Sequence, residues 1–120
     1  MTETKRVNAH ELEAFIARAF EAVDVPPADA RTIAELMTRA DVNGSEGHGV
    51  FRLPQYIRRI KGGAVNVRPN IRIEREAAAM ALVNGDNGMG QPSSTAAPCR
   101  RCAGRRPGTP YRRPCAIYRR

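Results

Sequence analysis

The chain has 120 residues, of which 42% are hydrophobic and 27% are charged, a composition typical of one small globular domain. Its net charge of +8 comes from the last quarter, because residues 1–91 carry twelve basic and twelve acidic side chains whereas residues 92–120 carry eight arginines and no acid. Apolar runs are far shorter than the roughly 20 residues that span a bilayer, and the polar start lacks the apolar core of a secretory signal, so we expect a cytoplasmic protein with no membrane partner.

Two amphipathic helices joined by a proline turn are predicted for the first forty residues. Asn8 is suited to cap the first helix, and apolar side chains recur after it at helical spacing until Pro26 and Pro27 stop the run. A second helix is predicted over residues 28–41. Because helices of this length are marginal alone, we expect them to pack on each other. The apolar side chains expected in this core include Leu12, Phe15, Phe20 and Met37.

A glycine-rich loop is predicted at residues 41–49, which contain three glycines and almost no apolar side chain. Helical spacing then resumes, and Pro54, tolerated in a first turn, places the start of a third helix near Leu53. From residue 65 the apolar period changes to two, which predicts two or three short strands at 65–67, 71–73 and 80–83, followed by a glycine-rich turn at 84–91. The predicted fold class is therefore α/β, more strictly α+β.

His48 and Arg52 form the pair with the clearest chemistry, because they lie four residues apart where the loop meets the third helix. An arginine fork binds a carboxylate through two parallel hydrogen bonds, and an imidazole exchanges a proton with a neighbouring oxygen near neutral pH. A small 2-hydroxy or 2-oxo acid presents both groups. On spacing alone, a solvent-exposed histidine beside a helical arginine explains the pair equally simply.

Two segments together resemble a known family. The first is Asp41-x-x-Gly44-x-x-x-His48-Gly49-x-x-Arg52-Leu53-Pro54-x-Tyr56, and the second is Leu82-Val83-x-Gly85-Asp86-Asn87-Gly88-x-Gly90-Gln91. Residues 7–91 resemble the opening of the malate/L-lactate dehydrogenase family, which is not a Rossmann family. The resemblance implies hydride transfer between NAD or NADP and a small 2-hydroxy or 2-oxo acid or related imine. It also implies that His48 transfers the proton, that Arg52 binds the substrate carboxylate, and that intact members are homodimers.

The chain departs from this family in two ways. Gly47 stands where the family commonly has a serine, so one substrate-binding hydroxyl is missing. The long cofactor-binding part expected after Gln91 is absent, so we expect this chain to be a truncated fragment that neither binds NAD(P) nor turns over. We therefore divide the chain into residues 1–91, the opening of the dehydrogenase domain, and residues 92–120, a disordered tail with no helical or strand period.

A shifted reading frame explains the composition of the tail. Codons for residues 92–98, read from the third base of the first codon, allow an apolar-apolar-polar-Arg-Arg-Ala sequence, which is the type that the family's next helix shows. A shifted GC-rich message also favours Arg, Pro, Ala, Gly and Cys with few acids, as residues 92–120 do.

Two other interpretations of residues 92–120 remain open. Eight arginines with Tyr111 and Tyr118 could make this a small basic nucleic-acid-binding protein, but paired arginines among prolines are a composition and not a motif, so we expect no specific nucleic-acid partner. Cys99, Cys102 and Cys115 could hold zinc, yet a closed site needs four ligands and the tail has no histidine. We therefore expect no metal site.

Overall fold

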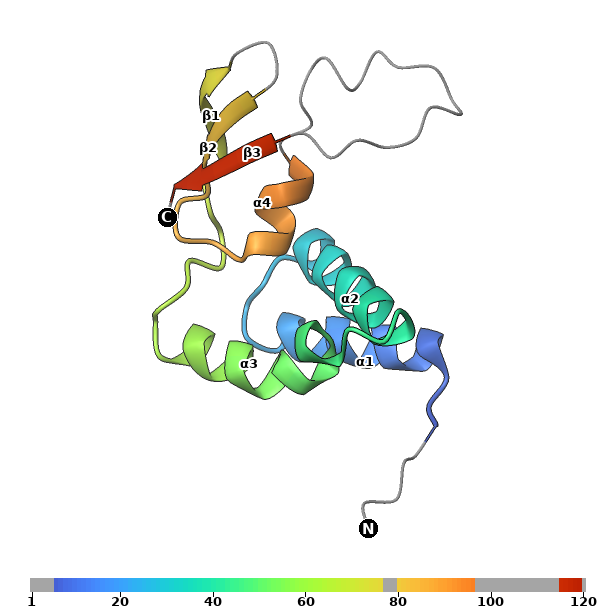
Figure 1. Ribbon diagram of the computed structural model, residues 1–120. Helices are drawn as coiled ribbons and strands as arrows, with labels where there is room; N and C mark the ends of the chain where they lie inside the picture. Colours follow the sequence, from blue (N-terminus) through green and yellow to red (C-terminus); the bar gives the residue numbers. More distant parts are fainter. Residues whose placement is uncertain (1–5, 77–79, 97–114, 120) are drawn as a thin grey trace. The chain divides into compact units, whose positions relative to one another are not determined.

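The computed structural model describes residues 6–76, 80–96 and 115–119 and divides into two compact units, Met1–Val67 and Arg68–Arg120 (Figure 1). The first unit contains α1 (Ala9–Glu21), α2 (Pro27–Val42), the 3-10 turns η1 (Glu46–His48) and η2 (Val50–Arg52), and α3 (Leu53–Lys61). The second contains β1 (Arg72–Glu76), β2 (Met80–Asn84), α4 (Gly90–Ala96) and β3 (Cys115–Arg119). This mixture of helices and strands confirms the predicted α/β class.

α1 begins at the predicted cap and ends slightly earlier than predicted. The side-chain oxygen of Asn8 accepts a hydrogen bond from the backbone N–H of His10 at 2.9 Å, which satisfies one of the N–H groups that a first turn leaves without a helical partner. The helix ends at Glu21, before the two prolines are reached, because Asp24 adopts a left-handed conformation with a φ of 66°. The turn that follows leads directly into α2.

The core of the first unit lies between α1 and α2, which pack on each other as predicted (Figure 1). Each fully buried aliphatic or aromatic side chain there stabilises the fold by about 1.5–3 kcal/mol relative to an exposed one. Phe15 is an exception to the predicted core, because its position on α1 leaves it 52% exposed. The buried apolar side chains of the two helices are Ile16, Phe20, Ala30, Ile33, Ala34 and Met37.

The second unit is built on a small mixed sheet with the strand order β1-β2-β3. β1 and β2 pair antiparallel, with Arg72 opposite Asn84, whereas β2 and β3 pair in parallel. Buried Ala81 and Val83 of β2, with Ile71 packed against them, form its core. The strand predicted at 65–67 is not formed; the run is only three residues long, and Pro69, two residues beyond it, has no N–H to extend a ladder.

The segment after Gln91 differs from its prediction in two places. α4 continues through Ala96, so the helix crosses the boundary placed at residue 91, and hydroxyl groups support its turns: Ser93 Oγ donates to the Met89 carbonyl at 3.0 Å and Thr95 Oγ1 to the Gln91 carbonyl at 3.2 Å. β3 is also regular, in a segment whose isoleucine and tyrosine favour strands. The disorder predicted for the tail otherwise concerns residues 97–114, which lie outside the described residues.

Candidate functional site

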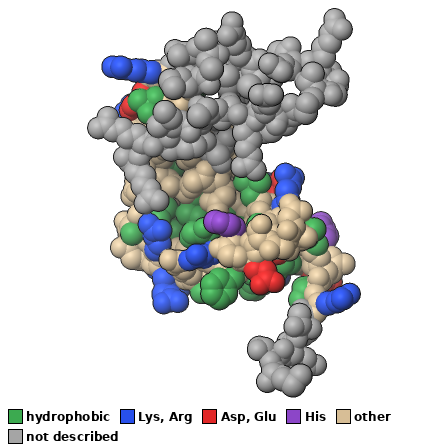
Figure 2. Space-filling model, in the orientation of Figure 1, with side chains coloured by type: hydrophobic (Ala, Val, Ile, Leu, Met, Phe, Trp, Pro, Cys, Tyr) green, Lys and Arg blue, Asp and Glu red, His purple; other side chains and the backbone are tan. Residues whose placement is uncertain are grey.

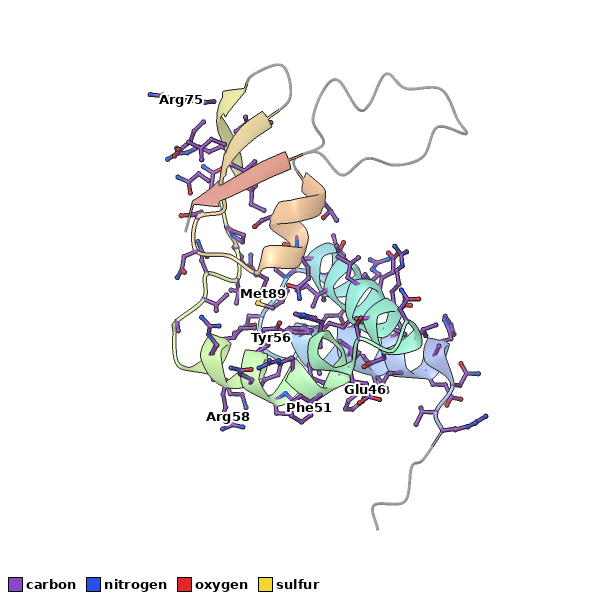
Figure 3. The ribbon with its side chains drawn as sticks, viewed as in Figure 1. Glu46, Phe51, Tyr56, Arg58, Arg75 and Met89 are labelled. Atoms are coloured by element: carbon purple, nitrogen blue, oxygen red, sulfur yellow. The ribbon has the colours of Figure 1, made fainter. Side chains whose placement is uncertain are left out.

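His48 and Arg52 lie on the two consecutive 3-10 turns that connect α2 to α3. His48 is the last residue of η1, Arg52 is the last residue of η2, and Gly49 separates the turns. α3 begins at Leu53 with Pro54 in its first turn, as the sequence predicts. Figure 3 labels Glu46 on η1, Phe51 on η2 and Tyr56 on α3, which mark the three elements around the pair.

The guanidinium of Arg52 is held in place by two hydrogen bonds. Its Nε donates to the backbone carbonyl of Gly47 at 2.8 Å, and its Nη1 donates to Oε1 of Gln55 at 2.8 Å. These bonds use two of the five N–H donors of an arginine. The head group is thus oriented before any ligand arrives, and among the described residues three donors are left for another acceptor.

The imidazole of His48 faces solvent. The side chain is exposed, and within the described part of the chain no hydrogen bond to either ring nitrogen is found. The backbone of His48 is nevertheless fixed, because its N–H donates to the Ser45 carbonyl at 2.9 Å. An accessible imidazole on a hydrogen-bonded turn is suited to exchange a proton with a bound small molecule.

Asp41 contributes a contact to this site that the sequence did not reveal. It lies on the last turn of α2, and its Oδ2 accepts a hydrogen bond from the backbone N–H of Val50 at 2.8 Å. Gln55, which holds Arg52, was likewise not singled out from the sequence. The spacing of Arg52 and Gln55, three apart on a helical turn, is the signal that could have found this second contact.

Apolar side chains surround the site at the surface. Phe51 is 75% exposed and Val42 is 70% exposed, although both are large and hydrophobic. Figure 2 shows hydrophobic side chains at the surface of the helical unit among charged ones. Both side chains are thus open to solvent among the described residues.

The second glycine-rich turn, residues 84–91, is packed against the segment around Pro69. An ideal Cβ on Gly88 would lie 2.5 Å from Cγ of Pro69, so the proline ring fills the space that the glycine opens. Asp86 Oδ2 accepts a hydrogen bond from the Asn70 backbone N–H at 2.9 Å. The turn therefore joins two segments of the second unit.

Residues 6–76, 80–96 and 115–119 contain no group of three or more histidine, cysteine, aspartate or glutamate side chains that could hold a metal ion. Cys99 and Cys102 lie outside these ranges. In the same ranges, every helix is too short or too polar to cross a bilayer.

An exposed imidazole one turn from an oriented guanidinium, on a glycine-rich connection between helices, defines a candidate site for a small carboxylic acid. Comparison with known proteins places the chain in a family. Residues 7–103 match the family model of malate/L-lactate dehydrogenase. The chain is 43% identical over 86 residues to malate dehydrogenase from Pyrococcus horikoshii, a match covering 72% of this chain and 24% of that protein.

Two solved structures resemble the chain in fold as well as in sequence. Sulfolactate dehydrogenase from Methanocaldococcus jannaschii matches with a TM-score of 0.70 at 33% identity, over 75% of this chain and 26% of that one. Delta1-piperideine-2-carboxylate reductase from Pseudomonas syringae pvar. tomato matches with a TM-score of 0.69 at 31% identity, over 78% and 28%. The chain belongs to the malate/L-lactate dehydrogenase family, and it spans about a quarter of the length of these relatives.

Proposed function

We propose that this chain carries the substrate-handling segment of an NAD(P)-dependent oxidoreductase for small 2-hydroxy or 2-oxo acids, or for a related cyclic imino acid. The observation that carries the proposal is the Arg52 guanidinium, held by Gly47 and Gln55 beside an exposed His48 in a member of this family. The relatives named above act on malate, on sulfolactate and on a piperideine-2-carboxylate. A carboxylate beside the reacting carbon is common to these substrates.

Each residue has one role in the proposed reaction. The free N–H donors of Arg52 bind the substrate carboxylate, which fixes the neighbouring C2 carbon near His48. In the oxidative direction His48 accepts the proton of the C2 hydroxyl while a hydride leaves C2; in the reverse direction the imidazolium returns that proton to the carbonyl oxygen. The nicotinamide supplies or accepts the hydride. Proton transfer of this kind contributes roughly 10²–10⁴-fold to the rate.

The nicotinamide nucleotide needs binding residues beyond those described. The turn at 84–91 lacks the GxGxxG spacing of a dinucleotide fingerprint, and Pro69 packs against its Gly88. We therefore propose that the 120-residue polypeptide by itself does not bind NAD(P) and does not turn over. The homodimer and the cytoplasmic location are proposals for the intact enzyme, supported by its membership of the family.

We further propose that the codons from Pro92 onward are read in a shifted frame. This would explain why the composition of the chain changes after residue 91. The arginine, proline and cysteine content of residues 92–120 and their lack of acids support this proposal. Two observations argue against a shifted frame, because α4 and the family match to residue 103 both continue past residue 91. Sequencing the gene across codons 91 and 92 decides the matter; an intact frame with no dehydrogenase sequence in either shifted frame rejects it.

Activity measurements test the proposed function. NADH and NADPH oxidation would be followed with pyruvate, oxaloacetate and cyclic imino acids, using the 120-residue chain and the product of the frame-restored gene. We expect no turnover by the first and turnover by the second that falls roughly 10²–10⁴-fold in His48→Ala. Robust turnover by the 120-residue chain, abolished by His48→Ala, would reject the proposed incompetence. Salt-sensitive, tail-dependent binding of a defined RNA would favour the alternative function.

A further inference from the structure

The Asp41 carboxylate occupies the place that a side chain on Gly49 would take. An ideal Cβ on Gly49 would lie 1.6 Å from Asp41 Oδ1 and 2.1 Å from its Cγ. Gly49 has a φ of −92° and a ψ of −151°, values that do not demand a glycine. The absence of a side chain at position 49 is therefore required by the approach of Asp41.

Asp41 also supplies the cap that the following helical segment lacks. Gly49 is the N-cap residue of η2 and has no side chain to bond the first N–H groups. Val50 opens a helical run that continues from η2 into α3, and its N–H is one of the groups that a helix start leaves without a partner. The Asp41 carboxylate, nine residues earlier in the chain, accepts a hydrogen bond from this N–H. Its negative charge is also favourable at the positive end of a helix.

Asp41, which provides this cap, lies one turn after buried residues of α2. One turn before Asp41 on α2, Met37 is 1% exposed and Thr38 is 4% exposed, so this face of the helix is packed in the core. Asp41 itself is only half-buried. The Asp41 carboxylate thus extends from the packed end of α2 to the connection between η1 and η2.

Backbone hydrogen bonds carry this constraint to both site residues. The Gly49 carbonyl accepts the backbone N–H of Arg52 at 3.0 Å, and the Gly49 N–H donates to the Glu46 carbonyl at 3.1 Å. Gly49, whose following peptide Asp41 holds, is therefore bonded through its N–H to the turn that ends in His48 and through its carbonyl to the turn that ends in Arg52.

We propose that Asp41 is the positioning residue of this site: its carboxylate, lying against Gly49 and bonded to Val50, sets where His48 and Arg52 stand relative to each other. The inference rests on the proposed function, since the relative placement matters when both residues act on one substrate. Asp41 acts through the backbone and is not itself a catalytic residue.

Nuclear magnetic resonance on the isotope-labelled 120-residue chain tests the placement. The variants are Asp41→Ala, which removes the acceptor, and Asp41→Asn, which keeps an oxygen without the charge. The matched control is Glu35→Gln, an exposed carboxylate on the same helix that pairs with Arg39. The readouts are the exchange rates of the Val50, Ile33 and Ala34 amides, together with the His48 ring and Arg52 Nε–H resonances.

We expect Asp41→Ala to speed exchange of the Val50 amide at least tenfold and to move the His48 and Arg52 resonances, while the Ile33 and Ala34 amides stay within twofold. Asp41→Asn should give a smaller change of the same kind, and Glu35→Gln none. Faster exchange spread equally over α2 would show a general structural role and overturn the proposal. An unchanged Val50 amide would overturn it as well. Should Asp41→Ala unfold the chain, the same criteria apply to Asp41→Asn.

A titration with L-malate separates this proposal from the proposed function. We expect L-malate, and not its neutral diamide, to shift the Arg52 Nε–H resonance of the unaltered chain, with at least fivefold weaker binding in Asp41→Ala. Equal binding by both chains would reject the positioning role while leaving the proposed function in place. No binding by the unaltered chain would count against the proposed function, and the Val50 exchange rate would still decide the role of Asp41.

Discussion

Replacing Gly49 by alanine puts a methyl group where the Asp41 carboxylate lies. The new Cβ would stand 1.6 Å from Oδ1, 2.1 Å from Cγ and 2.4 Å from Oδ2 of Asp41, all far inside van der Waals contact. A shift of a few tenths of an ångström cannot relieve three such overlaps. The carboxylate must rotate away, and its hydrogen bond from the Val50 N–H is then lost.

The expected cost follows from these two losses. A hydrogen bond to a charged group contributes about 1.5–3 kcal/mol, and forcing an extra methyl group into a packed site costs about 1–3 kcal/mol. Alanine recovers about 0.4–1 kcal/mol because it restricts the unfolded chain more than glycine does. The net loss of unfolding free energy is therefore roughly 2–5 kcal/mol, a large share of the 5–15 kcal/mol of a typical domain.

Urea unfolding followed by circular dichroism measures this loss, and Gly47→Ala is the matched control. A Cβ on Gly47 meets no atom within 4 Å, and its backbone is not left-handed, so alanine there should change stability by less than about 1 kcal/mol. The double variant Asp41→Ala/Gly49→Ala should be less destabilised than the sum of the single variants. Equal effects of Gly47→Ala and Gly49→Ala would refute the close approach.

Three further predictions concern other parts of the chain. Thr38→Val should raise the unfolding free energy by about 1 kcal/mol in a urea titration, because the buried Thr38 hydroxyl has no hydrogen-bond partner among the described residues; a loss of stability would show that it has one. Gly88→Ala should lower the protection of β2 amides from exchange, since its Cβ meets the Pro69 ring at 2.5 Å, and unchanged protection would contradict this packing. Arg52→Lys in the frame-restored enzyme should raise KM for the 2-oxo acid about tenfold or more, because an ammonium cannot reproduce the planar fork, and an unchanged KM would remove Arg52 from carboxylate binding.

The local features of the helical unit could be predicted from the sequence. Asn8 marks the start of α1, the two prolines mark the turn before α2, and Pro54 places the start of α3. These signals are local, because capping and proline geometry depend on neighbours within a few residues. The four-residue spacing of His48 and Arg52 is also a local signal, so the sequence alone predicted that the pair lies just before α3.

Features that depend on tertiary contacts could not be predicted. The Asp41 bond to Val50 spans nine residues and a loop whose course the sequence pattern does not define. Phe15 has the spacing of a core residue, yet it lies at the edge of the buried face. α4 begins in a segment without apolar periodicity, where hydroxyl groups bond back to carbonyls of the preceding turn.

The preference of the frame-restored enzyme for a 2-oxo acid over the corresponding 2-oxo amide tests the central claim most directly. Two charge-assisted hydrogen bonds from Arg52 at about 1.5–3 kcal/mol each predict a kcat/KM ratio of roughly 10²–10⁴ in favour of the acid. Arg52→Gln should abolish most of that preference, while His48→Ala should lower the rates for acid and amide alike. A preference for the acid that is unchanged in Arg52→Gln would contradict the account.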